Sequence, residues 1–354
     1  MRILFLFPYP ETCAASQRFR FEQYLKILEE EGYEVVTSPF LDFGTWQILY
    51  KKGRWTRKFI GLLKGYIRRL SLLFRVGDFD YVFVHREAEA IGPPLIECAL
   101  ARILKKKIIY DLDDAVWIPN SSEHNRFFAM LKWHSNAFAV ARMAYRISAG
   151  NDFLADKMRE FNKDVLVNPT TIDTEDHHNV LQSHENDIPV IGWTGTHSTL
   201  QYLDALFPVI RELKGEKDFE FIIISDNPPA RDNDLFEFVQ WNKESEIPDL
   251  MRMNIGLMPL DQDEWSMGKC GFKALQYMSL GIPALVSPVG VNESIVSDGI
   301  NGFICRTEKD WKQAILFLLN NREACRSMGK AARKKIEAAY SVQSNRANFL
   351  HLFS

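Results

Sequence analysis

The chain has 354 residues, of which 46% are hydrophobic and 25% are charged, and its formal net charge is -3. This is the composition of a soluble globular protein long enough for two domains, and its acidic balance argues against a general nucleic-acid binder. Five cysteines without C-x-x-C spacing argue against a disulfide framework or a zinc site and favour a reducing cytosol. No stretch approaches the roughly 20 apolar residues that cross a bilayer.

The first predicted elements form a β-α-β unit. Residues 3–7 are a continuous apolar run, as expected of a central parallel strand. A helix over about 16–31 and a second strand follow. The loop after the first strand lies at the carboxyl edge of the sheet, where open α/β folds bind ligands. We therefore expect Ser16, Arg18 and Arg20 to contact a ligand, although an ordinary helix-surface arginine remains the alternative for Arg18.

Residues 51–75 contain nine basic residues and no acidic ones. Apolar residues recur there at helical spacing: Phe59, Leu62, Leu63, Tyr66, Leu70 and Leu73. A basic amphipathic helix with Trp55 near one end is typical of a segment that lies on an anionic membrane surface. The alternative is that the apolar stripe packs on the sheet and the basic residues solvate the outside.

Polar residues follow the next two predicted strands. His85, Arg86 and Glu87 come after the strand over 81–84, and Asp111, Asp113 and Asp114 come at the end of the strand over 107–110. Three carboxylates in four residues repel one another unless something offsets them. Metal binding, recognition of a hydroxyl group by a general base, and capping of the next helix all remain open.

Residues 174–187 are polar and poor in hydrophobic residues, so they mark a domain boundary. We place a first domain at 1–173, a linker at 174–188, a second domain at 189–340 and a last helix at 341–354. Three histidines in the linker raise the alternative of a metal site. A solvated linker is favoured because no periodic element underlies them.

The second half restarts the strand-helix pattern. A strand over 189–193 leads into a turn with Gly195, Thr196 and Ser198, and then into a helix. Such a turn is an anion cradle, although the signal is weak by itself.

The most informative stretch is 264–304. Gly268, Lys269 and Gly271 form a glycine-rich loop before a helix predicted over 272–280, which Gly281 ends. The unpaired N–H groups and the dipole of a helix N-terminus attract an anion. Lys273 adds charge on the same helical face as Lys269, and Gln276 offers an amide to paired hydroxyls. The set suits a diphosphate followed by a ribose, whereas the alternative is a surface helix with ordinary lysines.

This stretch resembles the donor-binding signature of the retaining GT-B glycosyltransferases of family 4, the group 1 glycosyl transferases. Their pattern E-A-M-A-x-G-x-P-V-V-A-S matches Q-Y-M-S-L-G-I-P-A-L-V-S at 276–287, and a subgroup reads G-K-C-G-F-K-x-x-Q-Y-M. The Y-D-L-D-D-A-V-W at 110–117 is similar to the same subgroup. The paired glutamates of the family fall on Gly268 and Gln276, so Lys273 is expected to carry more of the diphosphate.

The resemblance covers nearly all of the chain and implies an α/β GT-B fold, with two doubly wound Rossmann-like domains facing a cleft and a last helix that returns to the first domain. It implies transfer of a sugar, with retention, from a nucleotide-diphosphate sugar such as a UDP or GDP sugar to a hydroxyl of a glycan or lipid-linked acceptor. Cell-envelope or exported polysaccharide synthesis, at the inner face of the plasma membrane, suits the basic helix. No cofactor or metal ion is expected because lysines supply the positive charge, and the chain is expected to be a monomer or dimer.

The resemblance also distributes the candidate residues among three roles. The catalytic candidates are Lys273, Asp113 and Asp111. The donor candidates are Gly195, Thr196, Ser198, Trp241, Gly268, Lys269, Gly271, Lys273, Gln276, Asn292 and Glu293. The acceptor candidates are Ser16, Arg18, Arg20, His85, Arg86, Glu87 and Asp114. Two alternatives stay open: a non-catalytic protein that binds a nucleotide sugar, and a nucleotide-sugar epimerase on the same fold.

Overall fold

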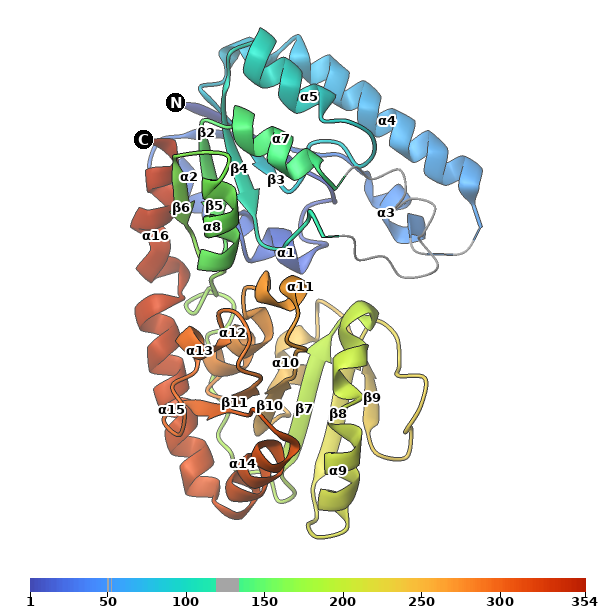
Figure 1. Cartoon of the computed structure of the whole chain (residues 1–354), viewed down its shortest axis with the longest axis vertical. Helices are drawn as coiled ribbons and strands as arrows, with labels where there is room; N and C mark the ends of the chain where they lie inside the picture. Colours follow the sequence, from blue (N-terminus) through green and yellow to red (C-terminus); the bar gives the residue numbers. More distant parts are fainter. Residues whose placement is uncertain (50, 52, 119–133) are drawn as a thin grey trace. The chain divides into compact units, whose positions relative to one another are not determined.

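The computed structural model describes residues 1–49, 51, 53–118 and 134–354 (Figure 1). Lys52 of the basic segment lies outside the described residues. The chain forms two compact units, one made of Met1–Thr170 with Asn345–Ser354 and the other of Thr171–Ser344. Each unit contains a six-stranded sheet. The predicted α/β class is therefore confirmed.

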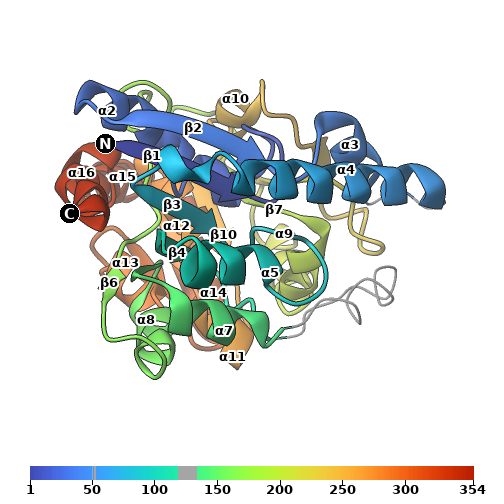
Figure 2. The same ribbon diagram turned by 90° about the horizontal axis from the view of Figure 1, so that it is seen from above.

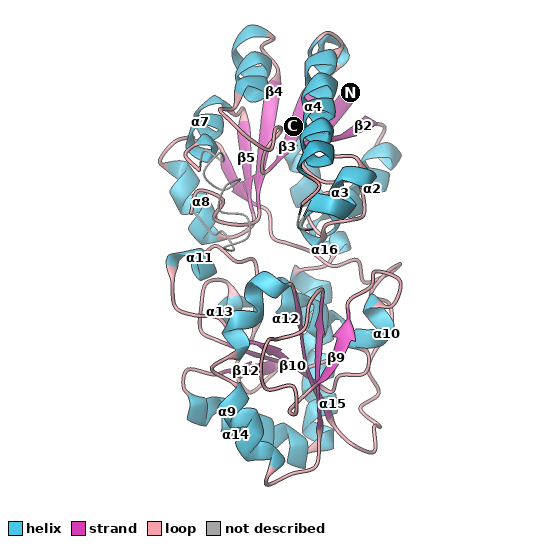
Figure 3. Cartoon of the chain, turned by 90° about the vertical axis from the view of Figure 1, so that its right-hand side faces the viewer, coloured by secondary structure: helices cyan, strands magenta, loops and turns pink. Residues whose placement is uncertain are grey.

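The first unit is built on a parallel sheet with the strand order β2-β1-β3-β4-β5-β6. The order reverses next to β1, so the loops after β1 and β3 flank the switch point where ligands bind in open α/β folds. The strands are β1 (Arg2–Phe7), β2 (Glu34–Pro39), β3 (Tyr81–His85), β4 (Lys107–Leu112), β5 (Arg146–Ala149) and β6 (Val165–Val167). The inner strands are buried almost throughout, because helices cover both faces of the sheet (Figure 3).

The helices of the first unit are α1 (Ala15–Arg18), α2 (Leu25–Glu30), α3 (Phe43–Leu49), α4 (Trp55–Leu73), α5 (Leu95–Cys98), α7 (Asn136–Met143) and α8 (Asp152–Arg159). A π-helical stretch over Ala99–Ile103 extends α5. The single helix predicted over 16–31 is wrong, because α1, a 3-10 turn at Glu22–Tyr24 and α2 replace it. The helix is interrupted because Arg20 and Phe21, between α1 and the 3-10 turn, are buried.

The end of the chain belongs to the aromatic core of the first unit. The ring of Phe349, in α16 (Val342–Leu350), stacks on Tyr24 with centroids 4.1 Å apart and planes 8° apart. Phe353 lies edge-on against Tyr81. Both phenylalanines are fully buried. Because such rings contribute a large buried area, they hold the last ten residues on the first unit.

Helix α4 runs along the first unit and packs on α3 and α5 (Figure 2). Its buried positions are Lys58, Gly61, Gly65 and Arg69, whereas Phe59, Ile60, Leu63, Ile67 and Leu70 are exposed. The predicted apolar stripe is therefore divided. Three of its members are exposed, and Leu62, Tyr66 and Leu73 are half-buried. The reading in which the stripe packs on the sheet is wrong, because small and charged residues form the inner face.

The second unit contains a parallel sheet with the order β12-β11-β10-β7-β8-β9. Numbered from its own first strand, this is the Rossmann order, and its switch point lies between β7 and β10. The strands are β7 (Val190–Gly195), β8 (Glu220–Ser225), β9 (Glu237–Gln240), β10 (Ile255–Met258), β11 (Ala284–Val286) and β12 (Gly302–Ile304). Trp193, Ile223 and Leu257 on these strands are part of one buried core.

The helices of the second unit are α9 (Phe207–Lys214), α10 (Glu246–Leu250), α11 (Glu264–Met267), α12 (Phe272–Ser279), α13 (Asn292–Ile295), α14 (Glu308–Asn320) and α15 (Arg322–Ala339). Helix α14 begins at a complete capping box in which Thr307 and Asp310 satisfy each other's backbone N–H groups. Ile210 of α9 and Ile315 of α14 pack into the same core as the strands.

The segment predicted as a solvated linker is packed on the second unit. His178 and His184 are buried, and Nε2 of His184 lies 2.8 Å from the carbonyl oxygen of Gly281. Arg333 of α15 donates to the carbonyl oxygens of His178 and Thr174. The expectation of solvation is wrong for His178 and His184, although most of residues 174–187 are exposed, because polar side chains in a segment without periodicity still pair with groups of distant elements.

Candidate active site

A buried charge network lies at the carboxyl ends of β3, β4 and β5. The strand register places His85 beside Asp111, and Asp111 beside Ser148. Asp111 accepts hydrogen bonds from Nη2 of Arg20 at 2.5 Å and from Oγ of Ser148 at 2.6 Å. Its Oδ2 lies 2.7 Å from Nδ1 of His85. Arg20 also donates to the backbone carbonyl of Asn168, so it links the network to the loop after β6.

The environment of Asp111 fixes both its charge and its role. Burial by itself raises the pKa of the carboxyl group, but the positive charges of Arg20 and His85 and their hydrogen bonds hold the pKa of Asp111 well below its usual range. The Asp111 side chain is 1% exposed. Asp111 and Arg20, expected at the site from the sequence, therefore lie beneath its surface and orient His85.

Asp113 is the carboxylate of this strand end that reaches toward the surface, with its side chain 10% exposed. Arg86 binds it through two hydrogen bonds, Nε to Oδ1 at 2.6 Å and Nη2 to Oδ2 at 2.9 Å. Burial raises the pKa of Asp113, but the charge of Arg86 outweighs it, and the pKa of this carboxyl group is lowered. Asp113 is therefore ionised.

His85 connects the two carboxylates. Its Nδ1 faces Asp111, and its Nε2 lies 4.0 Å from Oδ1 of Asp113. Nε2 is buried and has no hydrogen-bond partner among the described residues. A buried polar atom without a partner is unfavourable unless a ligand or a water molecule satisfies it. Asp111, His85 and Asp113 thus lie in a row, with Asp113 at its outer end.

Arg86 has a strained backbone, with φ at 60°. Two hydrogen bonds hold this conformation. The N–H of Arg86 donates to the carbonyl oxygen of Asp111 at 2.9 Å, and the hydroxyl of Tyr110 donates to the carbonyl oxygen of Arg86 at 3.0 Å. A non-glycine residue in this region costs about 1–3 kcal/mol and persists only where neighbours impose it. In this backbone conformation the guanidinium of Arg86 reaches Asp113.

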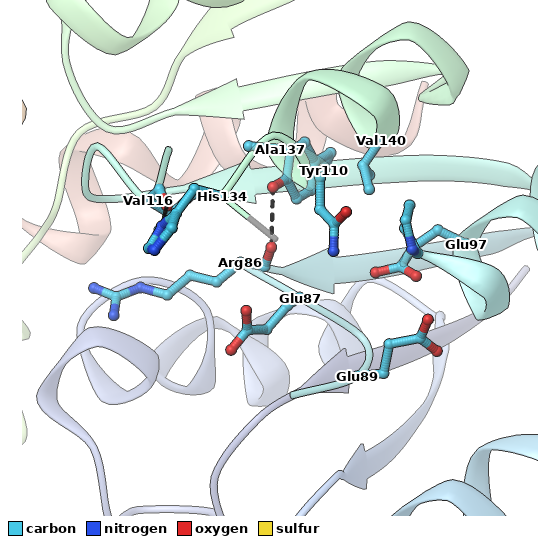
Figure 4. Close-up of a pocket in the computed structure, with 11 residues that line it drawn as sticks. Arg86, Glu87, Glu89, Glu97, Tyr110, Val116, His134, Ala137 and Val140 are labelled. Atoms are coloured by element: carbon cyan, nitrogen blue, oxygen red, sulfur yellow. Dashed lines mark hydrogen bonds between the residues drawn. The ribbon is translucent and has the colours of Figure 1, made fainter. Parts of the chain in front are cut away.

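Beside Arg86 lies a polar pocket, which we call the acidic pocket (Figure 4). Its lining residues come from the loop after β3, from β4, and from α5 and α7: Arg86, Glu87, Glu89, Pro94, Glu97, Tyr110, Val116, His134, Asn136, Ala137 and Val140. Two of the predicted acceptor residues, Arg86 and Glu87, are thus placed together. Glu89 and Glu97 were not predicted, since isolated glutamates carry no motif.

The remaining acceptor candidates lie around this edge. Ser16 and Arg18 are on α1, and the guanidinium of Arg18 lies 4.9 Å from the ring centroid of Phe19. Asp114 accepts a hydrogen bond from the N–H of Ala115. This bond lies within the turn after β4; residues 119–133 are outside the described part of the chain, so capping of the next helix stays a prediction.

In the second unit, the glycine-rich loop leads into α12 as predicted. Gly271 precedes Phe272 with φ at 69°, a left-handed conformation that side chains rarely adopt. Gly281 ends the helix with φ at 72°. Since Gly271 has no side chain to cap α12, the positive end of the helix dipole is offered to a ligand.

Lys273 lies next to the loop after β7. A Cβ atom on Gly195 would lie 2.7 Å from Cε of Lys273, so the two predicted donor loops meet here. Its Nζ is 5.2 Å from the ring centroid of Trp193. Burial, and then the nearby charge of Lys269, lower the pKa of Lys273 to about 7. A partly buried lysine whose charge is disfavoured by burial is poised to meet an anion.

The other donor candidates differ from one another in exposure and in contacts. The hydroxyls of Thr196 and Ser198 are exposed and lie 2.8 Å apart. Nζ of Lys269 lies 3.3 Å from the ring centroid of Trp265. Gly268 is the C-cap of α11. Two of the others are buried: Gln276 lies in α12, and Asn292 donates to the carbonyl oxygen of Ser287. Glu293 is exposed and pairs with Arg306, and the indole N–H of Trp241 donates to Glu246.

Two features of this edge were missed from the sequence. Asp226, after β8, accepts a hydrogen bond from the backbone N–H of His197 at 2.6 Å, and its other carboxylate oxygen lies 2.6 Å from Nδ1 of the same histidine. The hydroxyl of Tyr277 accepts from the N–H of Thr194 at 2.9 Å and donates to the carbonyl oxygen of Leu257. A histidine in the predicted anion cradle was the available signal for the first. The tyrosine carried no such signal, because only the fold brings α12 against the end of β7.

Within the part of the chain that the structure describes, no group of three or more histidine, cysteine, aspartate or glutamate side chains is placed to hold a metal ion. None of the described helices is both long enough and apolar enough to cross a membrane.

Sequence comparison finds a family model that matches part of the second unit. Residues 231–335 match the model of the family described as glycosyl transferases, group 1. Among curated proteins, spore coat protein SA of Bacillus subtilis is 26% identical over 127 residues, which are 35% of this chain and 33% of that protein. The chain is thus aligned with about a third of the length of this relative.

Comparison of the structure identifies the fold. The chain resembles sucrose-phosphate synthase of Thermosynechococcus elongatus with a TM-score of 0.71 and 13% identity, covering 100% of this chain and 98% of that one. It resembles a glycosyltransferase of Rickettsia africae with a TM-score of 0.69 and 11% identity, covering 99% and 97%. It also resembles Alr3699/HepE of Anabaena in complex with UDP-glucose, with a TM-score of 0.66 and 11% identity, covering 99% of both chains. The predicted GT-B fold is confirmed.

Proposed function

We propose that this chain transfers a sugar from a nucleotide-diphosphate donor to a hydroxyl group, with retention at the anomeric carbon; the match of residues 231–335 to the model of the group 1 glycosyl transferases supports the proposal. The observation that carries the proposal is the position of Lys273. It lies at the N-terminal turn of α12, beside Gly195, at the switch point of a Rossmann-ordered sheet.

The donor diphosphate gains negative charge as it leaves, so the protein must stabilise that charge. Lys273 and Lys269, together with the N–H groups of the first turn of α12, supply positive potential for this purpose. Lys273 is the more effective of the two because burial reduces the screening of its charge by water. A UDP or GDP sugar is the proposed donor class, and the UDP-glucose complex of Alr3699/HepE supports this choice.

The acceptor is proposed to bind the first unit near Asp113. Because Arg86 keeps Asp113 ionised, Asp113 accepts a hydrogen bond from the attacking hydroxyl and orients it. His85 stands behind it, held by Asp111. In this proposal Asp113 touches the substrate, and Asp111, Arg20 and His85 are positioning residues.

The proposal is tested by a thermal-shift screen of nucleoside diphosphates and their sugars on the wild type and Lys273→Ala. A ligand at a hundred times its dissociation constant raises stability by about 2.7 kcal/mol. We expect one nucleotide class to raise the melting temperature of the wild type and to leave that of the variant unchanged. If the same nucleotide stabilises both proteins equally, Lys273 does not bind the diphosphate.

We further propose that the acceptor is a lipid-linked glycan of the cell envelope or of an exported polysaccharide, and that α4 holds the protein on the inner face of the plasma membrane. The apolar side chains on the outer face of α4 support this proposal, with Phe59 67% exposed and Phe74, next to the helix end, 90% exposed. Contiguous apolar surface of this kind marks an interaction site.

Charge favours an anionic bilayer as the partner of α4. The exposed residues Arg54, Arg57, Lys64 and Arg75 flank the apolar face. Each basic residue near an anionic membrane contributes about 1 kcal/mol of binding free energy. By contrast, Arg69 is buried and donates to the carbonyl oxygens of Ala88, Ser38 and Phe7, so it fastens α4 to the first unit.

A vesicle sedimentation assay tests the docking of α4. The wild type should sediment with vesicles of phosphatidylglycerol and much less with phosphatidylcholine, and added salt should release it. The triple variant Leu63→Gln, Ile67→Gln, Leu70→Gln should stay in solution. A control pair on other elements, Ile103→Gln and Ile300→Gln, removes equally exposed apolar side chains and should bind as the wild type does. Equal sedimentation of the triple variant and the wild type would contradict the proposal.

A further inference from the structure

The acidic pocket carries an arrangement of carboxylates that the proposed reaction does not use. Glu97, from α5, is 2% exposed and lies deep in the lining. Its Oε1 accepts a hydrogen bond from the N–H of Ala88 at 2.9 Å. Its Oε2 is buried and has no partner within the described residues. An unsatisfied buried oxygen in a pocket wall is a hydrogen-bond acceptor available to a ligand.

A second carboxylate lies beside it, and Figure 4 shows the two groups on the same side of the pocket. Glu89 is buried and accepts from the N–H groups of Leu95 at 2.6 Å and of Ile96 at 3.3 Å. Glu87, on the same loop, contributes a third carboxylate to the lining. The pocket wall is therefore rich in carboxyl groups.

Positive charge near these carboxylates is already engaged. Arg69 is fully buried, and its donors are bonded to backbone carbonyls and to Ser38. Arg86 is paired with Asp113. Burial, and then the charge of Glu97, raise the pKa of Glu89 to about 8, and burial likewise raises the pKa of Glu97. The charge of Arg69 lowers the pKa of both glutamates but does not outweigh burial, so their ionised forms are only partly offset within the pocket.

We propose that the acidic pocket binds a primary ammonium group of the acceptor, and that the acceptor is therefore an aminated sugar. An ammonium group has three N–H donors and a full positive charge, so it both satisfies Oε2 of Glu97 and offsets the carboxylates. A hydroxyl group offers one donor and no charge. Val116, Ala137 and Val140 form the apolar part of the lining, and the pocket volume of about 20 Å³ holds a group of about the size of one water molecule, so the ammonium group enters and the sugar ring stays outside. The inference rests on the proposed function because it assigns the bound amine to the acceptor.

Binding of an ammonium group is coupled to protons. The titratable and charged groups that face Glu89 or Glu97 come from the neighbouring elements: Tyr66 and Arg69 on α4, Arg86 and Glu87 after β3, Tyr110 on β4, and His134 before α7. Because its pKa is raised to about 8, Glu89 is mostly protonated at pH 7 in the free protein. An incoming cation favours the ionised carboxylates, so binding releases protons.

Calorimetric titration with 6-amino-6-deoxyglucose and with glucose tests the proposal, since these sugars differ only by an ammonium group in place of a hydroxyl. The wild type should bind the amino sugar at least about tenfold more tightly, a difference of about 1.4 kcal/mol. Glu97→Gln keeps the shape and the bond from Ala88 but lacks the charge, and it should lose this preference. Glu29→Gln, at an exposed site on α2, should retain it. Equal affinity of the wild type for the two sugars, or an undiminished preference in Glu97→Gln, overturns the proposal.

A second measurement needs only the wild type and so does not depend on the folding of a variant. Titrations at pH 7 in two buffers with different ionisation enthalpies should show that protons are released when the amino sugar binds, and an absence of proton release contradicts the proposal. The same samples are then titrated with UDP and GDP. If a nucleotide binds but the amino sugar shows no preference, the inference about the acceptor fails while the transferase proposal stands. If neither nucleotide binds, the transferase proposal fails independently.

Discussion

Replacement of Lys273 by methionine tests how the second unit recognises a diphosphate. Burial and the charge of Lys269 lower the pKa of Lys273 to about 7, so the free protein is about half protonated there at neutral pH. A bound diphosphate favours the charged form and raises this pKa. Nucleotide binding should therefore take up protons and weaken as the pH rises above 7. Methionine fills a similar volume without a charge and should abolish this dependence.

The expected size follows from the pKa. If the pKa of Lys273 in the complex is above 9, the affinity follows the protonated fraction of the free protein. That fraction falls from about one half at pH 7 to about one hundredth at pH 9, a loss of about 50-fold or roughly 2.3 kcal/mol. The nucleotide itself adds little to this dependence, because its terminal phosphate has a pKa of about 6 and is fully ionised across the range.

Calorimetric titration with UDP and GDP at pH 7, 8 and 9 measures the dependence directly. The wild type should lose affinity by the factor given above. Lys273→Met should bind weakly at every pH, and Lys334→Met, at an exposed position on α15, should behave as the wild type does. An affinity that is flat from pH 7 to 9 in the wild type, or an equal slope in Lys273→Met, would refute the reasoning.

Three further predictions concern stability in urea titrations. Gly65→Ala should destabilise by about 1–3 kcal/mol, because the new Cβ would lie 2.8 Å from the carbonyl oxygen of Phe40, whereas Gly77→Ala, with open space around it, should change little; equal effects would contradict the close packing of α4. Asp111→Asn should cost about 3–5 kcal/mol because it leaves Arg20 buried without its charged partner, and a loss below 1 kcal/mol would speak against the network. The raised pKa of Glu89 stabilises the folded state at low pH, and this contribution is lost as the pH rises from about 4.5 to about 8. The free energy of unfolding of Glu89→Gln should therefore decline less over that range than that of the wild type. Parallel curves of unfolding free energy against pH would count against the raised pKa.

The sequence was most informative where glycine and proline interrupt an apolar pattern. The helix expected over 272–280 is α12, Phe272–Ser279, and the glycines at 271 and 281 have the positive φ that their positions require. The central strands were likewise predictable, because buried parallel strands are continuous apolar runs. Local signals of this kind do not depend on the rest of the fold.

The sequence was least informative where a residue's role depends on partners far along the chain. Asp111 was a catalytic candidate at a strand end, but it is buried against Arg20, which is 91 residues away in the sequence. Helix α4 has an obvious amphipathic pattern, yet the pattern does not say which face is inside. Gly61 and Gly65 allow a close approach to Thr45 and Phe40, and so the inner face is the one with small and charged residues.

The acidic pocket shows the same limit. Glu89 and Glu97 are eight residues apart on different elements, and no motif joins them. Hydrogen bonds between the loop after β3 and the start of α5 bring both carboxylates into one wall with Tyr110. The chemistry of such a site is a property of the tertiary structure.

The most direct test of the central claim is release of nucleoside diphosphate by the full chain in the presence of phosphatidylglycerol vesicles that carry lipid-linked glycan acceptors. We expect one UDP or GDP sugar to release its diphosphate only when acceptor is added, and the product to retain the anomeric configuration of the donor. Lys273→Met should bring the rate close to background. Binding of a nucleotide sugar without any release, with every acceptor, would contradict the account and identify the chain as a binding protein.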